Sequence, residues 1–232
     1  ITHVHEMENL FEIFADSFGY LKQRCNKYIA VSQGSIDALQ KRLEPEANIT
    51  FLKPFIDKKP SYSSVTRRPT TKFTIFGCGA VERRKGFDIF CEVAAQIVKK
   101  GFQNFKMYWI GSAEGKDLIP YAEIHKHNVS EYVEWLGPQD NARDHFISGD
   151  VFLLPSREDP YPLVCMEAAE CGMPVICFDA QAGGMHSFVE TDAGVVVPYL
   201  DKSIMADSII NIFNDKSLRE KMGRAAAQKV AD

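Results

Sequence analysis

Two carboxylates frame the start of an apolar helix in the segment EDPYPLVCMEAAECG, where seven residues separate Asp159 from Glu167. Pro162 suits the first helical position, because the N–H group that proline lacks would have no partner there. The free N–H groups of Leu163 and Val164 would then form a site for an anion. Glu167 follows about one turn later on the same face, and a carboxylate in such a helix is costly to bury without partners. A ribose would supply two hydroxyl donors. The alternative is that Glu167 is exposed or pairs with an arginine.

A basic loop lies in the segment FGCGAVERRKGFD, residues 76–88. Its G-x-G lacks the third glycine of a dinucleotide fingerprint, because Glu82 stands in that place. Arg83, Arg84 and Lys85 provide three consecutive cations at the mouth of a strand-to-helix loop, where they could neutralise a phosphate. A solvated run of charges is the alternative.

Strand and helix patterns alternate from residue 72 to residue 232. Apolar runs predict strands at 73–77, 106–111, 133–137, 151–155, 174–179 and 194–198. Helical spacing predicts helices at 86–101, around 118–127, near 142–147 and at 163–172, with two more at the end, where Asp201 and Asp215 are candidate N-caps. Continuous apolar strands separated by helices predict an α/β fold with a doubly wound, Rossmann-like parallel sheet. Such sheets bind ligands beyond the carboxyl ends of their strands.

The first 55 residues predict a smaller unit. A helical stretch at 8–24, a strand at 27–32, a helix capped by Ser32 and a strand at 48–52 give only two strands, too few to bury a sheet alone. We therefore expect residues 1–55 to be the end of a partial second α/β domain. Residues 56–71 are polar and aperiodic, which predicts a linker to a domain at 72–232. We expect the chain to be a fragment at both ends.

Residues 72–232 resemble the C-terminal, nucleotide-sugar-binding domain of retaining glycosyltransferases of the GT-B fold, family 4 (glycosyl transferases group 1). The matching stretches are, in order, RKGFD, WLG, GDVFLLPSREDPYPLVCMEAAECGMPVICFD and the following GG. The stretches KYIAVSQGSIDAL and NITFLKPFID resemble the end of the N-terminal, acceptor-side domain of the same family.

The resemblance implies roles for four residues. The family motif has two acidic residues with seven between them, which here are Asp159 and Glu167. It implies that Asp159 holds hydroxyls of the donor sugar, that Glu167 holds the ribose, and that Lys85 and Arg84 stabilise the departing diphosphate. The donor site implied is Gly79, Asp159, Pro160, Tyr161, Pro162, Leu163, Val164 and Glu167.

The sequence departs from the family pattern at three positions. Asp159 replaces the usual glutamate, Pro162 stands where glycine is frequent, and Ala80 stands where many members carry a phosphate-binding arginine. The shorter Asp159 reaches less far, which bears on the identity of the donor sugar.

The implied reaction moves a sugar from a nucleoside-diphosphate sugar to a carbohydrate or other hydroxyl acceptor, with retention and without a metal or a cofactor. No divalent metal is needed where cations and a helix start stabilise the leaving group. His5 and Glu6 are expected on the acceptor side, although a surface position fits His5 equally well. His186, after two glycines, is another candidate to face the cleft. We expect the fragment alone to bind its donor without turnover.

Proteins with other functions share this fold. A nucleotide-sugar epimerase or a phosphorylase would use the same site, and a non-catalytic module would only bind there. An NAD(P)-dependent oxidoreductase would need an acidic residue at the end of the second strand, and Glu114 lies too far along for that role.

Composition narrows the classes further. A net charge of −4 argues against a nucleic-acid-binding surface, which needs clustered Lys and Arg. The six cysteines form no C-x-x-C pair and lie mostly in apolar runs, so we expect reduced thiols and no zinc site. The H-x-H pairs lack an obvious third ligand, which also predicts no metal. No signal peptide or long apolar segment is visible, so we expect a cytoplasmic protein. Peripheral membrane association of the full-length enzyme is compatible with this expectation.

Overall fold

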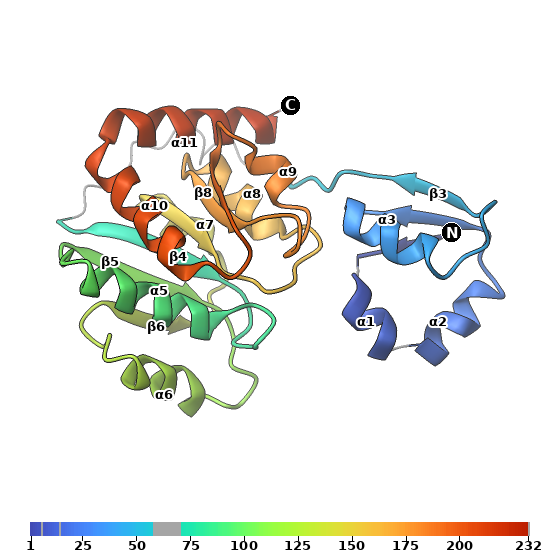
Figure 1. The fold of residues 1–232 in the computed structure, drawn as a ribbon, viewed down its shortest axis with the longest axis horizontal. Coiled ribbons are helices and arrows are strands. Elements are labelled where there is room, and N and C mark those ends of the chain that lie inside the picture. The colour runs from blue at the N-terminus through green and yellow to red at the C-terminus, as the bar shows by residue number, and fades with distance from the viewer. Residues whose placement is uncertain (6, 14, 58–70, 232) are drawn as a thin grey trace.

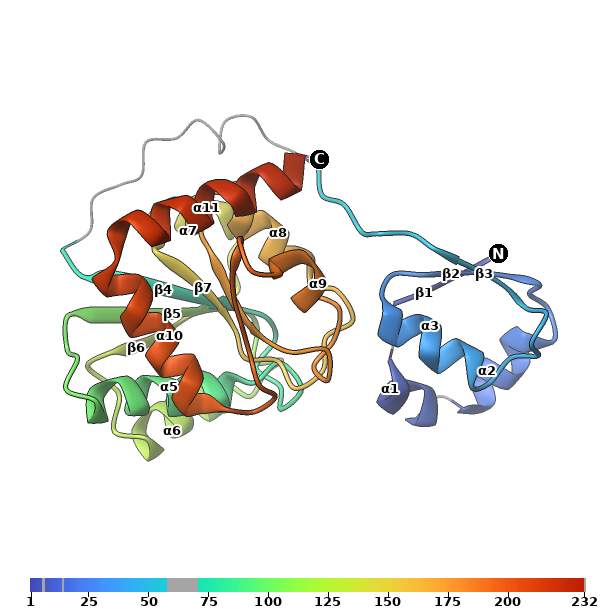
Figure 2. The same cartoon turned by 45° about the horizontal axis from the view of Figure 1, so that its top comes forward.

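The computed structural model of the chain describes residues 1–5, 7–13, 15–57 and 71–231. Figures 1 and 2 show two parallel β-sheets, each with helices packed against it. None of the helices in these described ranges is both long and apolar enough to cross a membrane.

The larger sheet has six parallel strands in the order β6-β5-β4-β7-β8-β9. They are β4 (Phe73–Cys78), β5 (Phe105–Ile110), β6 (Val133–Gly137), β7 (Val151–Leu154), β8 (Val175–Phe178) and β9 (Gly194–Val197). Each predicted strand of this region is present within one residue of its predicted ends. The order of the strands reverses between β4 and β7, and a doubly wound sheet binds its ligand at such a switch point. The predicted fold class is confirmed.

Helices cover both faces of this sheet. They are α5 (Phe87–Lys99), α6 (Leu118–Lys126), α7 (Arg143–Phe146), α8 (Leu163–Glu170), α9 (His186–Val189), α10 (Lys202–Asn214) and α11 (Lys216–Ala231). Figures 1 and 2 show α5, α6 and α10 on one face and α7, α8, α9 and α11 on the other. All four residues of β7 are buried, as expected for a strand covered on both faces. The four-residue α9 was not predicted, because one turn is too short to reveal a helical period.

The predicted caps of the last two helices are confirmed. Asp201 accepts a hydrogen bond from the backbone N–H of Ile204 at 2.9 Å, and Asp215 accepts one from Leu218 at 2.8 Å. Gly101 follows α5 with φ of +85°, a left-handed conformation that favours glycine after a helix.

The smaller sheet has three parallel strands, β1 (Thr2–Val4), β2 (Lys27–Ala30) and β3 (Asn48–Phe51). The prediction of two strands was wrong, because β1 is only three residues long and is recognised by its register with β2. The helices of this part are α1 (Glu8–Ile13), α2 (Ala15–Lys22) and α3 (Gln33–Gln40). The predicted N-cap is confirmed, since Ser32 Oγ accepts a hydrogen bond from the N–H of Ser35 at 3.1 Å.

The carboxyl end of β3 points toward the larger sheet (Figure 1), and β1 and β2, labelled in Figure 2, run parallel to it. Val31, which follows β2, is only 4% exposed and belongs to the same apolar cluster as Tyr161 and Met185. A Cβ atom on Gly184 would lie 3.0 Å from the Cβ atom of Ser32. The two units therefore touch at the carboxyl edges of their sheets. The domain division at 1–55, 56–71 and 72–232 stays a prediction, and most of the predicted linker lies outside the described residues.

Candidate functional site

Two oppositely charged side chains meet at the switch point between β4 and β7. Lys85, in the loop after β4, donates a hydrogen bond from Nζ to Oδ2 of Asp159, in the loop after β7, at 2.7 Å. The Asp159 side chain is 8% exposed and that of Lys85 is 21% exposed. Ser156 Oγ lies 3.5 Å from the same carboxylate oxygen. The sequence predicted both charged residues for one site, and the structure brings them together.

Close backbone approaches fix the two loops. Gly86 has φ of +78°, and a Cβ atom there would lie 2.1 Å from the carbonyl oxygen of Pro155. Gly183 has φ of +140°, and a Cβ atom there would lie 1.8 Å from the carbonyl oxygen of Asp159. The Asp159 N–H also donates to the carbonyl of Ala182 at 2.7 Å. Glycine is therefore required for the loops after β4, β7 and β8 to lie this close.

The start of α8 lies next to this pair of loops. Pro162 occupies the N-cap position with an extended backbone, so it stands one residue before the predicted position, and Leu163 is the first helical residue. The first N–H groups of a helix have no intrahelical partner and carry the positive end of its dipole. Leu163 is 44% exposed, which leaves this helix start accessible to a ligand.

Glu167 is partly exposed and has an arginine nearby. Its side chain is 32% exposed, and its Oε1 atom lies 3.5 Å from Nη2 of Arg143. The buried Arg143 also pairs with the buried Glu170, at 3.1 Å between Nε and Oε2. The alternative raised from the sequence, an arginine partner, is therefore present. At 3.5 Å and with a shared guanidinium the contact is a weak one, so the carboxylate of Glu167 can still accept hydrogen bonds from a ligand.

Glu167 and Lys85 lie in the same electrostatic neighbourhood, at the end of β4. Burial, and to a smaller extent the negative charge of Glu167, raise the pKa of the Cys78 thiol to about 12, while the positive charge of Lys85 acts in the opposite direction. Cys78 thus reports that the acid on α8 and the cation of the basic loop both lie close to the last residue of β4.

Two other predicted residues, Gly79 and Arg84, lie in the loop after β4. Gly79 has φ of +153°, and a Cβ atom there would touch the stem of Lys85 at 3.4 Å. Arg84 donates from Nη1 to the carbonyl of Glu158 at 3.2 Å, and its Nε lies 3.9 Å from Oε2 of Glu82. The guanidinium of Arg84 thus bridges the loops after β4 and β7 in this structure.

Tyr161 and its neighbour Pro160 complete the segment before α8. The carbonyl of Pro160 accepts a hydrogen bond from the N–H of Gly184 at 2.8 Å. The hydroxyl of Tyr161 is buried, has no hydrogen-bond partner among the described residues, and has its pKa raised by burial to about 12. Tyr161 belongs to the same apolar cluster as Val31 of the smaller unit.

The predicted acceptor-side residues are only partly described. His5 is exposed and directly follows β1 at the edge that faces the larger sheet, whereas Glu6 lies outside the described residues. His186 lies 2.8 Å from the carbonyl oxygen of Gly183 through Nδ1, which places it beside the segment that pairs with Asp159.

Four residues of this neighbourhood were missed from the sequence: Asp88, Arg143, Ser156 and Arg157. Ser156 carried a signal, since it lies two residues after the end of β7, at the carboxyl edge of the sheet. The others are recognised by partners far along the chain, because Arg157 binds Asp88 across 69 residues. Sequence spacing alone carries no sign of such a pair.

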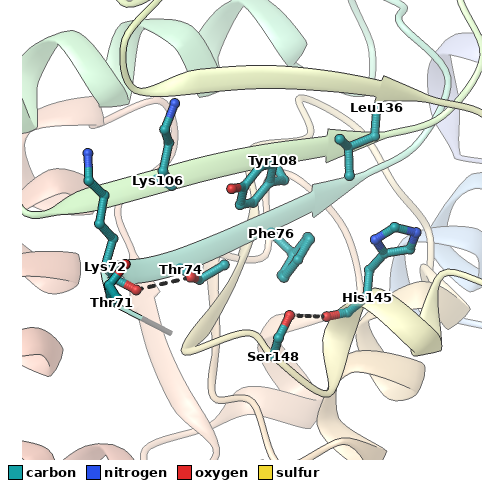
Figure 3. A pocket seen from close by; sticks show the side chains of 9 residues that line it. All are labelled: Thr71, Lys72, Thr74, Phe76, Lys106, Tyr108, Leu136, His145 and Ser148. Atoms are coloured by element: carbon teal, nitrogen blue, oxygen red, sulfur yellow. Dashed lines mark hydrogen bonds between the residues drawn. The ribbon is translucent and has the colours of Figure 1, made fainter. Parts of the chain in front are cut away.

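A larger hollow lies elsewhere (Figure 3). It measures about 610 Å³ and is lined by Thr71, Lys72, Thr74, Phe76, Lys106, Tyr108, Leu136, His145 and Ser148. It opens on the face of β4 and β5, and the space beside Asp159 is only about 10 Å³. Size favours the larger hollow, but the switch point, the ion pair and the helix start favour the smaller one, so we assign the site there.

All six cysteines are free thiols, as predicted. Among the described residues, no group of three or more His, Cys, Asp or Glu side chains is arranged to hold a metal ion.

The protein thus has a Rossmann-like, doubly wound sheet with a cation, an acid and a helix start at its switch point, the place where such sheets bind ligands. The family model for glycosyl transferases group 1 matches residues 58–229. The chain belongs to this family.

Curated relatives are similar over much of the chain. It is 24% identical to N-acetyl-alpha-D-glucosaminyl L-malate synthase of Bacillus anthracis over 210 residues, which cover 87% of this chain and 54% of that protein. It is 29% identical to D-inositol 3-phosphate glycosyltransferase of Paenarthrobacter aurescens over 187 residues, 75% of this chain and 45% of that one. The chain thus spans about half the length of these relatives.

Solved structures share the fold. TarM has a TM-score of 0.83 at 21% identity, covering 98% of this chain and 46% of TarM. Anabaena Alr3699/HepE, crystallised with UDP and glucose, has a TM-score of 0.83 at 18% identity, covering 99% of this chain and 66% of that one. The fold is therefore that of the GT-B glycosyltransferases.

Proposed function

We propose that the protein takes part in transferring a sugar from a nucleoside-diphosphate sugar to a hydroxyl group of an acceptor. The observation that carries the proposal is the Lys85–Asp159 pair at the switch point, next to the start of α8. The names of the relatives support it, since they are glycosyltransferases and a synthase of the same family. The UDP and glucose bound by Alr3699/HepE support this class of donor.

In this proposal the diphosphate lies against Lys85 and the first N–H groups of α8. A preorganised cation and helix start stabilise negative charge as it builds on the leaving group, with no metal ion and no cofactor. Arg84 adds charge to the same loop. The donor-binding segment is Gly79 with residues 159–164, and its roles remain those that the family resemblance implies.

The two acids would hold the two sugars of the donor. Glu167, one turn into α8, accepts hydrogen bonds from the ribose, and its partial exposure leaves its oxygens available. Asp159 accepts hydrogen bonds from hydroxyls of the transferred sugar. Because aspartate is shorter than glutamate, Asp159 sets how closely that sugar must approach.

We propose that the reaction retains the configuration of the anomeric carbon. The bond from that carbon to the phosphate oxygen breaks, a bond to the acceptor oxygen forms on the same face, and the acceptor proton passes to the leaving phosphate. Retention of this kind needs no side-chain nucleophile.

The acceptor, a carbohydrate or another hydroxyl compound, would bind between the two units. Residues 1–55 would belong to an acceptor-side domain, 56–71 would link it to the donor domain at 72–232, and His5 would face the acceptor. We propose a cytoplasmic location, and peripheral membrane attachment of a longer protein is compatible with it.

A thermal-shift panel with UDP, GDP, ADP and NAD tests the proposal. We expect at least one nucleoside diphosphate to raise the melting temperature of the chain and NAD to leave it unchanged. The Lys229→Gln variant is a matched control, because Lys229 is 20% exposed and pairs with Glu190 and Asp192, neither of which belongs to the proposed site. Stabilisation by NAD alone would favour an oxidoreductase and refute the proposal. A radiolabelled-donor assay, in which we expect no turnover by residues 1–232, tests the predicted domain organisation.

A further inference from the structure

Arg157 binds Asp88 through both carboxylate oxygens. Its Nη1 donates to Oδ1 at 2.8 Å and its Nη2 donates to Oδ2 at 2.7 Å. The two side chains are 22% and 28% exposed, so most of the contact is shielded from water. A two-point contact of this kind fixes orientation as well as distance, because both groups are planar. It joins the loop after β7 to the first turn of α5.

The same arginine also holds the basic loop. Its Nη1 donates to the carbonyl of Arg83 at 2.6 Å, and its backbone N–H donates to the carbonyl of Arg84 at 2.8 Å. Lys85 of the proposed site is the residue after Arg84, and Asp159 lies two residues after Arg157. The carbonyl of Arg157 in turn accepts a hydrogen bond from the hydroxyl of Tyr199 at 3.1 Å.

The guanidinium of Arg157 is occupied by contacts within the protein. Three hydrogen bonds occupy Nη1 and Nη2 of Arg157, and two of them go to the carboxylate of Asp88. A phosphate would have to displace a carboxylate that is held at two points. Arg157 therefore differs from Lys85, whose single flexible ammonium group can turn from Asp159 to a ligand.

We propose that Arg157 and Asp88 are positioning residues, which hold the loop of Lys85 against the loop of Asp159 so that both meet the ligand in one geometry. This inference rests on the proposed function, because the ligand is the diphosphate of a donor. Ordering a loop and its lysine side chain on binding costs conformational entropy. When contacts already hold the backbone of the loop in place, the entropy cost of binding is lower.

The test compares Arg157→Gln, Asp88→Asn and Arg157→Lys with a matched control, Lys202→Gln. Lys202, at the start of α10, pairs with Glu92 of α5, the helix that also carries Asp88. Among the described residues, no contact joins Lys202 to the basic loop. Two readouts are needed. The first is the dissociation constant for UDP from calorimetry. The second is the nuclear magnetic resonance signal of Lys85 in a protein whose lysines carry isotope-labelled methyl groups. This signal is assigned by its loss in the Lys85→Arg variant.

We expect Arg157→Gln and Asp88→Asn to weaken UDP binding about tenfold and to move the Lys85 signal toward its position in Asp159→Asn. Arg157→Lys keeps the charge but loses the fork, so we expect it to restore little of either readout. Lys202→Gln should change neither.

An unchanged Lys85 signal in both Arg157→Gln and Asp88→Asn would overturn the inference, as would full recovery by Arg157→Lys. Absence of UDP binding by the unsubstituted chain would count against the proposed donor, while the Lys85 signal would still decide the positioning role. If Arg157→Gln fails to fold, Asp88→Asn, which keeps its shape, decides the question.

Discussion

Replacing Lys85 with glutamine removes the cation from the proposed site and leaves its shape nearly intact. A hydrogen bond to a charged group contributes about 1.5–3 kcal/mol, so the dissociation constant for UDP should rise by about tenfold to a hundredfold. The same change leaves the carboxylate of Asp159, 8% exposed, without its cation. Losing one member of a fully buried pair costs about 3–5 kcal/mol, and because Lys85 is 21% exposed we expect a smaller loss of folding stability, about 2 kcal/mol.

Calorimetric titration with UDP and urea unfolding measure these two effects separately. Lys229→Gln is again the control, because that lysine has nearly the same exposure and bonds to the carbonyl of Phe188 and to two acids. We expect Lys229→Gln to lower stability without changing the affinity for UDP. Equal affinity of the Lys85→Gln variant and the unsubstituted chain for UDP would refute the assignment of Lys85 to the diphosphate.

Four further changes test other contacts. Glu167→Gln should weaken UDP binding about tenfold and leave inorganic pyrophosphate binding unchanged, and equal loss for both ligands would contradict the ribose role. Asp159→Asn should leave UDP affinity within about threefold and weaken UDP-glucose at least about tenfold in the same titration. Tyr161→Phe removes a buried hydroxyl that lacks a partner among the described residues, so the unfolding free energy should rise by up to about 1 kcal/mol, and a clear fall would reveal a partner. Burial alone would raise the pKa of Asp88, but the hydrogen bonds and charge of Arg157 outweigh burial and lower it. Its stabilisation is therefore complete above the unfolded-state pKa of about 3.9 and is lost as the pH falls through the lower folded-state value. In urea melts, the stability gap between Asp88→Asn and the unsubstituted chain should be full near neutral pH and close in acid, whereas a gap independent of pH would contradict the ion pair.

The sequence predicted the larger sheet because its signals are local. Each strand is an apolar run, and Asp201 and Asp215 mark helix starts that the structure confirms. The sequence also placed Lys85 and Asp159 in loops at the carboxyl edge of the sheet. Their direct contact depends on the adjacency of β4 and β7, which the sequence did not predict.

Other features depend on partners that sequence spacing does not reveal. The strand β1 is too short to show alternation, and it forms through its register with β2. Arg143 stands in a short polar helix, and only the folded chain brings it to Glu167 and Glu170. The predicted placement of Pro162 differed by one residue, within the usual imprecision of helix ends.

A crystal structure of the chain with the nucleoside diphosphate that stabilises it most tests the central claim directly. We predict that phosphate oxygens lie within hydrogen-bond distance of Lys85 Nζ and of the first N–H groups of α8, with the ribose hydroxyls on Glu167. A diphosphate bound in the hollow lined by Phe76 and Tyr108, with Lys85 still paired only to Asp159, would contradict the account.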